Sequence, residues 1–368
     1  MILQLIRCCT GNSFQFFIFQ FSVLGGNILI IRLSAIGDVA MTVPVVYSLA
    51  RSYPSLHISV LSRPYARAFF EGIADNVSFI EADLKGRHAG FRGLNRLYAE
   101  LRKEGFTAVA DMHDVLRTKF LRMRFGIDAV KMAVIDKHRR EKRLLTRKRN
   151  KVMRELPSSF EYYRDVLRRL GYEFEVKFNS IYEGRNFCYE NIYNIVGEKR
   201  GRWIGVAPFA NHQGKIYPLE RMRNVVKKLS EGIPGVRIFL FGGGKDEMDV
   251  FNDWQRNIPG VVNASALLGG LNNEMLLMSK LDVMLSMDSA NAHIASLVGT
   301  RVISLWGATH PFAGFRSWNI SEDDIVQRCL PCRPCSVYGN KKCMRGDYEC
   351  LNIDEDIIVD KIVNSFKF

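Results

Sequence analysis

The segment NILIIRLSAIGD, residues 27–38, decides the fold of this chain. Its first part, Asn27–Leu33, is an apolar run typical of a strand buried in a parallel sheet. The turn SAIGD follows, and a segment with helical periodicity then runs from about Val39 to Ser52. A strand, a short turn and a helix in this order indicate the start of a doubly wound α/β domain.

Apolar runs and helical segments keep alternating along the rest of the chain. In the first half we expect further strands at Leu56–Ser62, Val77–Ile80, Phe106–Ala110 and Lys131–Ile135. In the second half we expect strands at Trp203–Ala207, Val236–Phe241, Val261–Val262, Asp282–Ser286 and Arg301–Leu305, and a last helix at Asp354–Ser365. Strands joined by crossover helices form parallel sheets. The sequence therefore predicts two Rossmann-like domains, residues 27–178 and 179–368, that face a ligand-binding cleft.

The composition is ordinary except for its charge. The 368 residues are 47% hydrophobic and 24% charged, which is typical of a soluble globular protein with room for two cores. The net charge of +14 indicates a polyanionic partner: nucleic acid, an anionic membrane surface, or an acidic or phosphorylated substrate. Residues 137–154 carry +9 of this charge and contain no aromatic residue, so they offer no stacking platform for single-stranded bases. This basic segment is either a solvated surface or a contact surface for an anionic ligand.

Residues 1–26 are expected to be a dispensable extension. Their apolar stretch, Phe14–Leu24, has eleven residues, whereas a membrane-spanning helix needs about 20. The small-residue pattern of a signal-peptide cleavage site is also poor. We expect no transmembrane span.

The turn after the first strand carries the first candidate for chemistry. In RLSAIGD, residues 32–38, Gly37 permits a close approach of the backbone, and the amides at the start of the helix face an anion. Asp38 is placed either as the N-terminal cap of the helix or as a functional carboxylate at the mouth of the cleft.

Three connections in the second half carry similar signals. They are APFANHQGKIYP at residues 207–218, FLFGGGKDE at residues 239–247 and MDSANAHIASLVGT at residues 287–300. Lys215 stands just before a helix, where it suits a phosphate, and the glycine-rich turn suits a nucleotide. Asp288 opens a helix and His293 follows on its first turns. Each signal alone is equally explained by a surface lysine, a helix cap or a structural histidine.

In this order and at this spacing, the four segments resemble glycosyltransferase family nine, the ADP-heptose:lipopolysaccharide heptosyltransferases. The resemblance runs from Asn27 to about Phe315. Its motifs are the opening I-L-I-I-R-x-S-x-x-G-D, a K-x-[W/Y]-P loop at Lys215–Pro218, a G-G-x-x-[D/E] turn at about Gly242–Glu247, a D-[S/T]-x-x-x-H segment at Asp288–His293 and the segment WGATHP at Trp306–Pro311. Ala290 departs from the family pattern, in which glycine is usual, and this leaves the identity of the donor open.

The resemblance implies a GT-B fold and an inverting, metal-independent transfer. A heptose or related sugar would move from an ADP-sugar to the inner core of lipopolysaccharide or a related glycan. Asp38 would be the catalytic base, since an acceptor hydroxyl is a poor nucleophile, and Lys215 would stabilise the leaving diphosphate. The other donor-binding residues would be Asn211, Gly242, Gly243, Glu247, Asp288, Ser289, Asn291 and His293. The acceptor- or anion-binding residues would be Ser34, Gly37, Arg139, Arg140, Lys142 and Arg143.

This interpretation also fixes the expected partners. We expect an ADP-sugar donor, an anionic glycolipid acceptor at the membrane surface, no nucleic acid, and a monomer located in the cytoplasm on the inner face of the cytoplasmic membrane. Two alternatives are another GT-B enzyme such as a nucleotide-sugar epimerase, and a nucleic-acid-binding protein that uses the basic segment. An epimerase has no need of an acceptor base, and no recognisable nucleic-acid module surrounds residues 137–154.

A cysteine-rich segment, residues 329–350, raises the question of a metal. The spacing is C-x2-C-x2-C-x7-C-x6-C, formed by Cys329, Cys332, Cys335, Cys343 and Cys350. Such spacing predicts either a structural zinc site or reduced thiols, and it does not match a ferredoxin run. Disulfides are not expected in the cytoplasm. No cofactor is expected to be required for catalysis.

Overall fold

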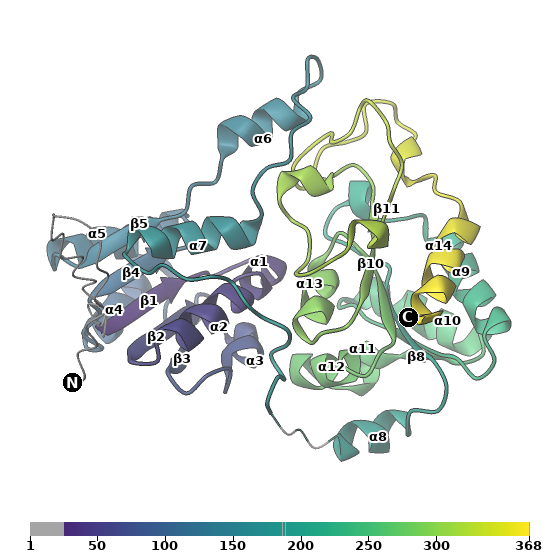
Figure 1. The fold of residues 1–368 in the computed structure, drawn as a ribbon, viewed down its shortest axis with the longest axis horizontal. Coiled ribbons are helices and arrows are strands. Elements are labelled where there is room, and N and C mark those ends of the chain that lie inside the picture. The colour runs from purple at the N-terminus through teal and green to yellow at the C-terminus, as the bar shows by residue number, and fades with distance from the viewer. Residues whose placement is uncertain (1–25, 186, 188, 368) are drawn as a thin grey trace, which may run out of the picture.

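The computed structural model describes residues 26–367 except 186 and 188 and folds into two lobes (Figure 1). The expected extension at residues 1–26 lies outside the described residues except for its last one. The first lobe holds a parallel sheet of five strands in the order β3-β2-β1-β4-β5. Its strands are β1 (Gly26–Ile31), β2 (Leu56–Ser62), β3 (Val77–Glu81), β4 (Ala108–Asp111) and β5 (Lys131–Val134). Its helices are α1 (Ile36–Ala40), α2 (Val43–Ser52), α3 (Arg67–Phe70), α4 (Gly90–Arg102), α5 (Leu116–Ile127), α6 (Arg139–Thr146) and α7 (Ser159–Arg169).

The second lobe holds a parallel sheet of six strands in the order β11-β10-β9-β6-β7-β8. Its strands are β6 (Trp203–Ala207), β7 (Arg237–Leu240), β8 (Val261–Asn263), β9 (Val283–Met287), β10 (Val302–Trp306) and β11 (Ile325–Gln327). Its helices are α8 (Glu190–Val196), α9 (Leu219–Gly232), α10 (Lys245–Asn257), α11 (Ala264–Leu267), α12 (Leu271–Met278), α13 (Ala290–Leu297) and α14 (Glu355–Asn364). Among the short 3₁₀ turns are Pro64–Ala66, Gln213–Lys215 and Pro311–Ala313.

The fold class predicted from the sequence is confirmed: both sheets are parallel and their strands are joined by helices. Each predicted strand lies within two residues of an observed one, and β11 was not predicted because only Val326 of its three residues is buried, which leaves no apolar run. The single helix predicted at Val39–Ser52 is wrong. The structure divides it into α1 and α2, and Pro44 lies in the first turn of α2. Proline suits this place because it has no N–H to donate and its φ is already helical.

The central strands explain why the opening segment decides the fold. All four residues of Ile28–Ile31 in β1 and all five residues of β6 are buried. A strand buried on both faces is apolar throughout because helices cover both sides of a parallel sheet. In each lobe the chain first adds strands on one side and then returns to the other, so the order reverses between β1 and β4 and between β6 and β9. Ligands of such sheets bind beside this reversal, at the carboxyl ends of the strands.

The lobes are in contact near these carboxyl ends. Helix α1 lies beside α13, which begins directly after β9 (Figure 1). Around the basic α6, Leu145 and Leu156 pack against Ala313 of the second lobe. The carboxyl ends of the central strands of both lobes therefore meet near one place.

Candidate active site

Asp38 lies in α1, just after β1, and is held by Arg32. The Arg32 Nη2 atom is 2.7 Å from Asp38 Oδ2, and Arg32 Nη1 donates to the Met112 carbonyl at 2.7 Å. Arg32 is buried, whereas the Asp38 side chain is 27% exposed. Burial alone would lower the pKa of Arg32, but Tyr163 and Asp38 raise it above its ordinary value. The guanidinium is therefore a fixed cation that orients a carboxylate still open to a ligand.

The Asp38 carboxylate lines a cavity of about 210 Å³ that both lobes enclose. The first lobe contributes Arg32, Ser34, Ala35, Asp38, His113, Val115, Ile135, Lys137, Lys142, Ser159, Tyr162 and Tyr163, and the second lobe contributes Phe315 and Tyr338. Three basic side chains, those of Arg32, Lys137 and Lys142, line so small a space beside a single carboxylate. The cavity is therefore suited to an anionic or highly hydroxylated ligand.

Two residues of the basic segment reach this cavity, Lys137 and Lys142, and Lys142 is packed against aromatic rings there. The Lys142 Nζ lies 5.2 Å from the centre of the Tyr162 ring and 4.7 Å from that of Phe315. Burial lowers the pKa of Lys142 to about 8, although the charge of Asp38 acts in the opposite direction. Aromatic faces attract the ammonium group, so the side chain is held in place in its charged form.

The other residues predicted to bind the acceptor divide into two groups. Ser34 lines the cavity, and Gly37 lies behind it at the contact between the lobes. Arg139 lies on the exposed face of α6, with Nη2 3.9 Å from Asp114 Oδ2, and Arg140 and Arg143 are exposed on the same helix. The structure thus brings Ser34 and Lys142 to Asp38 and places the three arginines outside.

His113 in this cavity was missed by the sequence reasoning. It follows β4, is 8% exposed, and its Nδ1 accepts a hydrogen bond from the Leu33 amide at 3.3 Å. Burial, and then the charges of Arg32 and Lys137, lower its pKa to about 3. The ring is therefore neutral at neutral pH, and Nε2 carries its proton as a hydrogen-bond donor. The signal that could have found it is a histidine placed three residues after the predicted strand Phe106–Ala110.

The second lobe holds a matching ion pair. Lys215, in the connection after β6, lies with Nζ 2.9 Å from Oδ2 of Asp288, the residue that follows β9. Thr309, after β10, donates its hydroxyl to the same oxygen at 2.8 Å. Asp288 is 6% exposed. Because β10, β9 and β6 are neighbours in the sheet, their connections bring these three side chains together.

His293 lies between the two ion pairs. A Cβ on Gly37 would stand 3.0 Å from the His293 ring, so glycine is what lets α1 approach α13 this closely. The ring nitrogen Nδ1 lies 3.3 Å from the Ser317 hydroxyl. Burial lowers the pKa of His293 to about 4, although the charges of Asp288 and Asp38 act in the opposite direction. A neutral histidine thus separates the two carboxylates.

The glycine-rich turn lies at the same sheet edge, after β7. The Gly243 amide donates to Glu247 Oε2 at 2.7 Å, and the Gly242 amide donates to the Ser265 hydroxyl at 2.9 Å. A Cβ on Gly242 would stand 2.3 Å from Glu247 Oε2 and 2.9 Å from the Phe251 ring, so a side chain there would displace the Glu247 carboxylate from the turn. Burial raises the pKa of Glu247. Gly243 is exposed with open space around it, and a ligand can approach its backbone.

The remaining residues predicted to bind the donor lie around the Lys215–Asp288 pair. Asn211 is exposed in the connection after β6, with its Nδ2 3.4 Å from His212 Nε2. Ser289 precedes the first turn of α13, its hydroxyl 3.2 Å from that of Ser286, and Asn291 is half-buried within that turn. The structure places these three residues after the carboxyl ends of β6 and β9 in the second sheet.

The cysteine-rich segment forms no metal site in this structure. All five of its cysteines are free thiols, and no group of three or more His, Cys, Asp or Glu side chains is arranged to hold a metal in the described part of the chain. Cys335 donates to the Cys332 carbonyl at 3.4 Å, and Cys343 lies 3.9 Å from Asp347 in its own loop. Cys350 is buried in the apolar core of the second lobe, and burial raises its pKa to about 11. The zinc geometry predicted from the spacing is not arranged among the described residues, in which Cys350 is buried and Cys329 is exposed.

Comparison with known proteins decides the family. The model of glycosyltransferase family 9 (heptosyltransferase) matches residues 94–344, which is more than half of the chain. The chain belongs to glycosyltransferase family 9. The resemblance noted in the sequence is confirmed, and this family member is a glycosyltransferase. Of the enzyme alternatives, the epimerase is therefore set aside.

Individual relatives agree with this assignment. The chain is 24% identical over 294 residues to the lipopolysaccharide core heptosyltransferase OpsX of Haemophilus influenzae, covering 77% of this chain and 80% of that protein. A family 9 glycosyl transferase of Veillonella parvula has the same fold, with a TM-score of 0.68 at 18% identity and coverage of 92% and 97% of the two chains. E. coli ADP-heptose lps heptosyltransferase II gives a TM-score of 0.66 at 15% identity and coverage of 92% and 98%. The predicted GT-B fold is confirmed.

Proposed function

We propose that this glycosyltransferase moves a heptose, or a closely related sugar, from an ADP-sugar to the inner core of lipopolysaccharide or a related glycan, with inversion and without a metal. The observation that carries the proposal is the pair of ion pairs, Arg32–Asp38 in one lobe and Lys215–Asp288 in the other, on either side of the contact between α1 and α13. The names of the relatives, a lipopolysaccharide core heptosyltransferase and an ADP-heptose heptosyltransferase, support the choice of donor and acceptor.

Asp38 acts as the base in this proposal. The acceptor hydroxyl enters the cavity beside the carboxylate and gives up its proton to it as the oxygen attacks the anomeric carbon of the donor sugar. Arg32 orients the carboxylate, and the Ala35 amide, 3.2 Å from Asp38 Oδ2, fixes it further. One displacement forms the new glycosidic bond and breaks the bond from the anomeric carbon to the diphosphate, so the configuration inverts.

The second lobe binds the departing nucleotide. Charge develops on the diphosphate as its bond to the sugar breaks, and a cation at that place lowers the barrier. Lys215 supplies this cation together with the free amides of the first turn of α13. In the structure the charge of Lys215 is balanced by Asp288, so the diphosphate competes with this carboxylate. Both Lys215 and Thr309 contact Oδ2 of Asp288, which leaves Oδ1 as the oxygen for a sugar hydroxyl.

The acceptor side is the first lobe. The basic residues of its cavity, Arg32, Lys137 and Lys142, suit a phosphorylated or acidic inner-core sugar. We therefore propose residues 27–178 as the acceptor domain and 179–368 as the donor domain of a monomer that works in the cytoplasm at the inner face of the membrane. Within the described residues no helix is long and apolar enough to cross a membrane.

The test is a panel of nucleotide sugars incubated with the full chain. ADP-heptose, ADP-glucose and UDP-glucose are supplied with and without delipidated inner-core acceptor, and nucleotide release and product mass are measured. The proposal predicts release that depends on the acceptor and is fastest for ADP-heptose, with a product heavier by one heptose. Excess EDTA should leave the rate within about twofold of its value, because the chain's own cations stabilise the diphosphate. Release without acceptor, or preference for a uridine donor, contradicts the proposal.

A further inference from the structure

In the part of the chain that the structure describes, helix α5 presents a largely exposed apolar stripe to solvent. Leu116, Phe120, Met123 and Ile127 recur at the spacing that places side chains on one face of a helix. Leu116 is 84% exposed, Ile127 is 73% exposed and Met123 is 58% exposed. The opposite face of α5 already packs in the core through Leu121 and Phe125. Phe120 of the stripe also packs against this core, so the part of the stripe that the described residues leave exposed is Leu116, Met123 and Ile127.

Helix α4 widens this stripe into a patch. Phe91, which is 68% exposed, packs its ring edge-on against Phe120 of α5, with the ring centres 5.0 Å apart. Between the helices lies an open cavity of about 790 Å³ with mainly apolar walls. Its lining consists of Gly90, Phe91, Leu94, Val115, Leu116, Arg117, Lys119, Phe120 and Met123. Contiguous apolar surface of this kind on a soluble protein marks an interaction site.

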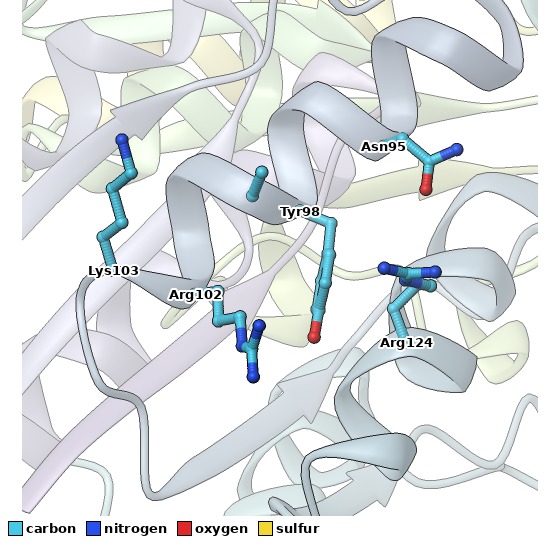
Figure 2. A pocket seen from close by; sticks show the side chains of 6 residues that line it. Asn95, Tyr98, Arg102, Lys103 and Arg124 are labelled. Carbon is cyan, nitrogen blue, oxygen red and sulfur yellow. The ribbon is translucent and has the colours of Figure 1, made fainter.

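Basic residues surround the patch. Helix α5 contains four basic residues and no acidic one, and α4 contains three basic residues and one acidic residue. Figure 2 shows a second pocket farther along the same two helices, whose lining includes Arg102 and Lys103 at the end of α4 and Arg124 of α5. The Arg124 guanidinium lies over the Tyr98 ring at 4.7 Å. An apolar face with a cationic border complements an anionic lipid surface, in which acyl chains lie beneath negative headgroups.

The patch begins at the mouth of the Asp38 cavity. Val115 lines both the apolar cavity and the Asp38 cavity, and Leu116 is the next residue along the chain. The connection between the two is held by Asp114, whose carbonyl accepts from Lys137 Nζ at 2.8 Å and whose carboxylate binds Arg122 at 3.0 Å. A surface seated on this patch therefore lies next to the place where the acceptor hydroxyl would enter.

We propose that the α4–α5 face docks the enzyme on an anionic bilayer. The side chains of Phe91, Leu116 and Met123 enter the boundary between headgroups and acyl chains, and the flanking arginines and lysines bind the headgroups. The inference rests on the proposed function in that the acceptor is a glycolipid of that bilayer. The docked face presents the sugar of a lipid anchored beside it to Asp38.

The direct test is co-sedimentation of the full chain with lipid vesicles in the absence of any donor. Vesicles of phosphatidylcholine alone are compared with vesicles of phosphatidylcholine and phosphatidylglycerol. The double variant Leu116→Ser/Met123→Ser is compared with Ile195→Ser/Ile357→Ser, which removes exposed apolar side chains from α8 and α14 of the second lobe. Thermal melts of both variants check that they fold.

The proposal predicts that the wild type and the second-lobe variant bind the anionic vesicles and that salt weakens this binding. The patch variant loses about tenfold or more in partitioning, since binding scales with the apolar area inserted. With delipidated acceptor the patch variant keeps the wild-type rate, whereas with acceptor embedded in vesicles its rate falls with its binding. Vesicle binding equal to the wild type overturns the proposal. The proposal is also overturned if sedimentation velocity shows that the wild type is a dimer and the patch variant a monomer, because the face then contacts a second copy of the chain. Failure of transfer to the delipidated acceptor contradicts the proposed function instead and leaves the vesicle result to be judged separately.

Discussion

The substitution Asp38→Asn separates the role of this carboxylate in catalysis from its role in the fold. Asparagine has the same shape and can still accept hydrogen bonds from Arg32 and from the Ala35 amide, the two donors that hold Asp38 Oδ2 at 2.7 and 3.2 Å. It cannot take a proton from an acceptor hydroxyl. The substitution therefore removes the base and keeps the contacts.

The expected sizes of the two effects differ. A positioned general base contributes about 10²–10⁴ in rate, which corresponds to about 2.7–5.4 kcal/mol of transition-state stabilisation. A hydrogen bond to a charged group is worth about 1.5–3 kcal/mol and a neutral one about 0.5–1.5 kcal/mol, so the lost ion pair costs about 1–2 kcal/mol of folding free energy. A domain with about 5–15 kcal/mol of stability remains folded after such a loss. Loss of rate in the variant is thus loss of chemistry.

The assay measures kcat from ADP release with saturating acceptor, donor affinity by calorimetry, and unfolding by urea. The matched control is Asp114→Asn, which removes another carboxylate at the same sheet edge that is paired with an arginine, 3.0 Å from Arg122. We expect a fall in kcat of about 10²–10⁴ for Asp38→Asn with unchanged donor affinity, and a rate close to that of the wild type for Asp114→Asn. A kcat for Asp38→Asn within about threefold of the wild type, or an equal loss in the control, refutes the assignment of the base.

Three further predictions concern the cations. Lys215→Met should weaken ADP-sugar binding by about tenfold or more, because a charge-assisted contact to the diphosphate is lost. The control Lys227→Met, on the exposed face of α9, should bind the donor as the wild type does. Calorimetry with the donor measures both variants, and equal affinities would remove Lys215 from the donor site. The pKa of Lys142 is lowered to about 8, so the side chain loses its charge as the pH rises through 8. The KM for the acceptor should therefore rise above that pH in the wild type and stay level in Lys142→Arg, whose guanidinium stays charged. Parallel pH profiles of the acceptor KM in the two proteins would show that Lys142 does not bind the acceptor. The exposed arginines of α6 are Arg139, Arg140 and Arg143. Replacing them with serine should raise the acceptor KM and reduce its dependence on salt, while the donor KM stays unchanged. A rise in the donor KM alone would assign these residues to the nucleotide.

Much of the architecture could be predicted from the sequence because buried parallel strands are continuous apolar runs. β2 and β6 coincide with their predicted ranges, and the alternation of strands with helices gives the two doubly wound sheets. The break between α1 and α2 could not be placed by periodicity, because the apolar pattern continues across Thr42 while the α-helical hydrogen bonding does not: the Thr42 amide donates to the Val39 carbonyl, three residues back, at 2.9 Å.

The sequence predicts individual candidate residues of the site but not the contacts between them. Asp38, Lys215 and Asp288 each follow a strand, where ligands of α/β folds are bound, but the pairing of Lys215 with Asp288 joins two connections that are far apart in the sequence. Arg32, the residue after β1, opens the segment RLSAIGD, but the segment does not indicate that its guanidinium is buried and paired with Asp38.

Burial sets the roles of several residues that the sequence alone did not distinguish. Lys142 is one of ten basic residues in the segment 137–154, and only its packing between Tyr162 and Phe315 distinguishes it from its neighbours. His113 gains its neutral state from burial beside two cations. The cysteine spacing indicated a metal, but spacing does not record that Cys350 is buried in the core. The burial and charge around a side chain depend on segments that are far apart in the sequence, so a local sequence pattern does not predict them.

The most direct test of the account is the position of the donor between the two ion pairs, measured in a crystal structure of the chain with a non-transferable ADP-sugar analogue. A hydroxyl must lie within about 3 Å of the base and about 3–3.5 Å from the carbon that it attacks, so the anomeric carbon should be about 6 Å from the Asp38 carboxylate. The account also predicts the diphosphate in contact with Lys215 and the first turn of α13. A diphosphate bound away from Lys215, or an anomeric carbon more than about 10 Å from Asp38 in the closed complex, is too far for this base to act and contradicts the account.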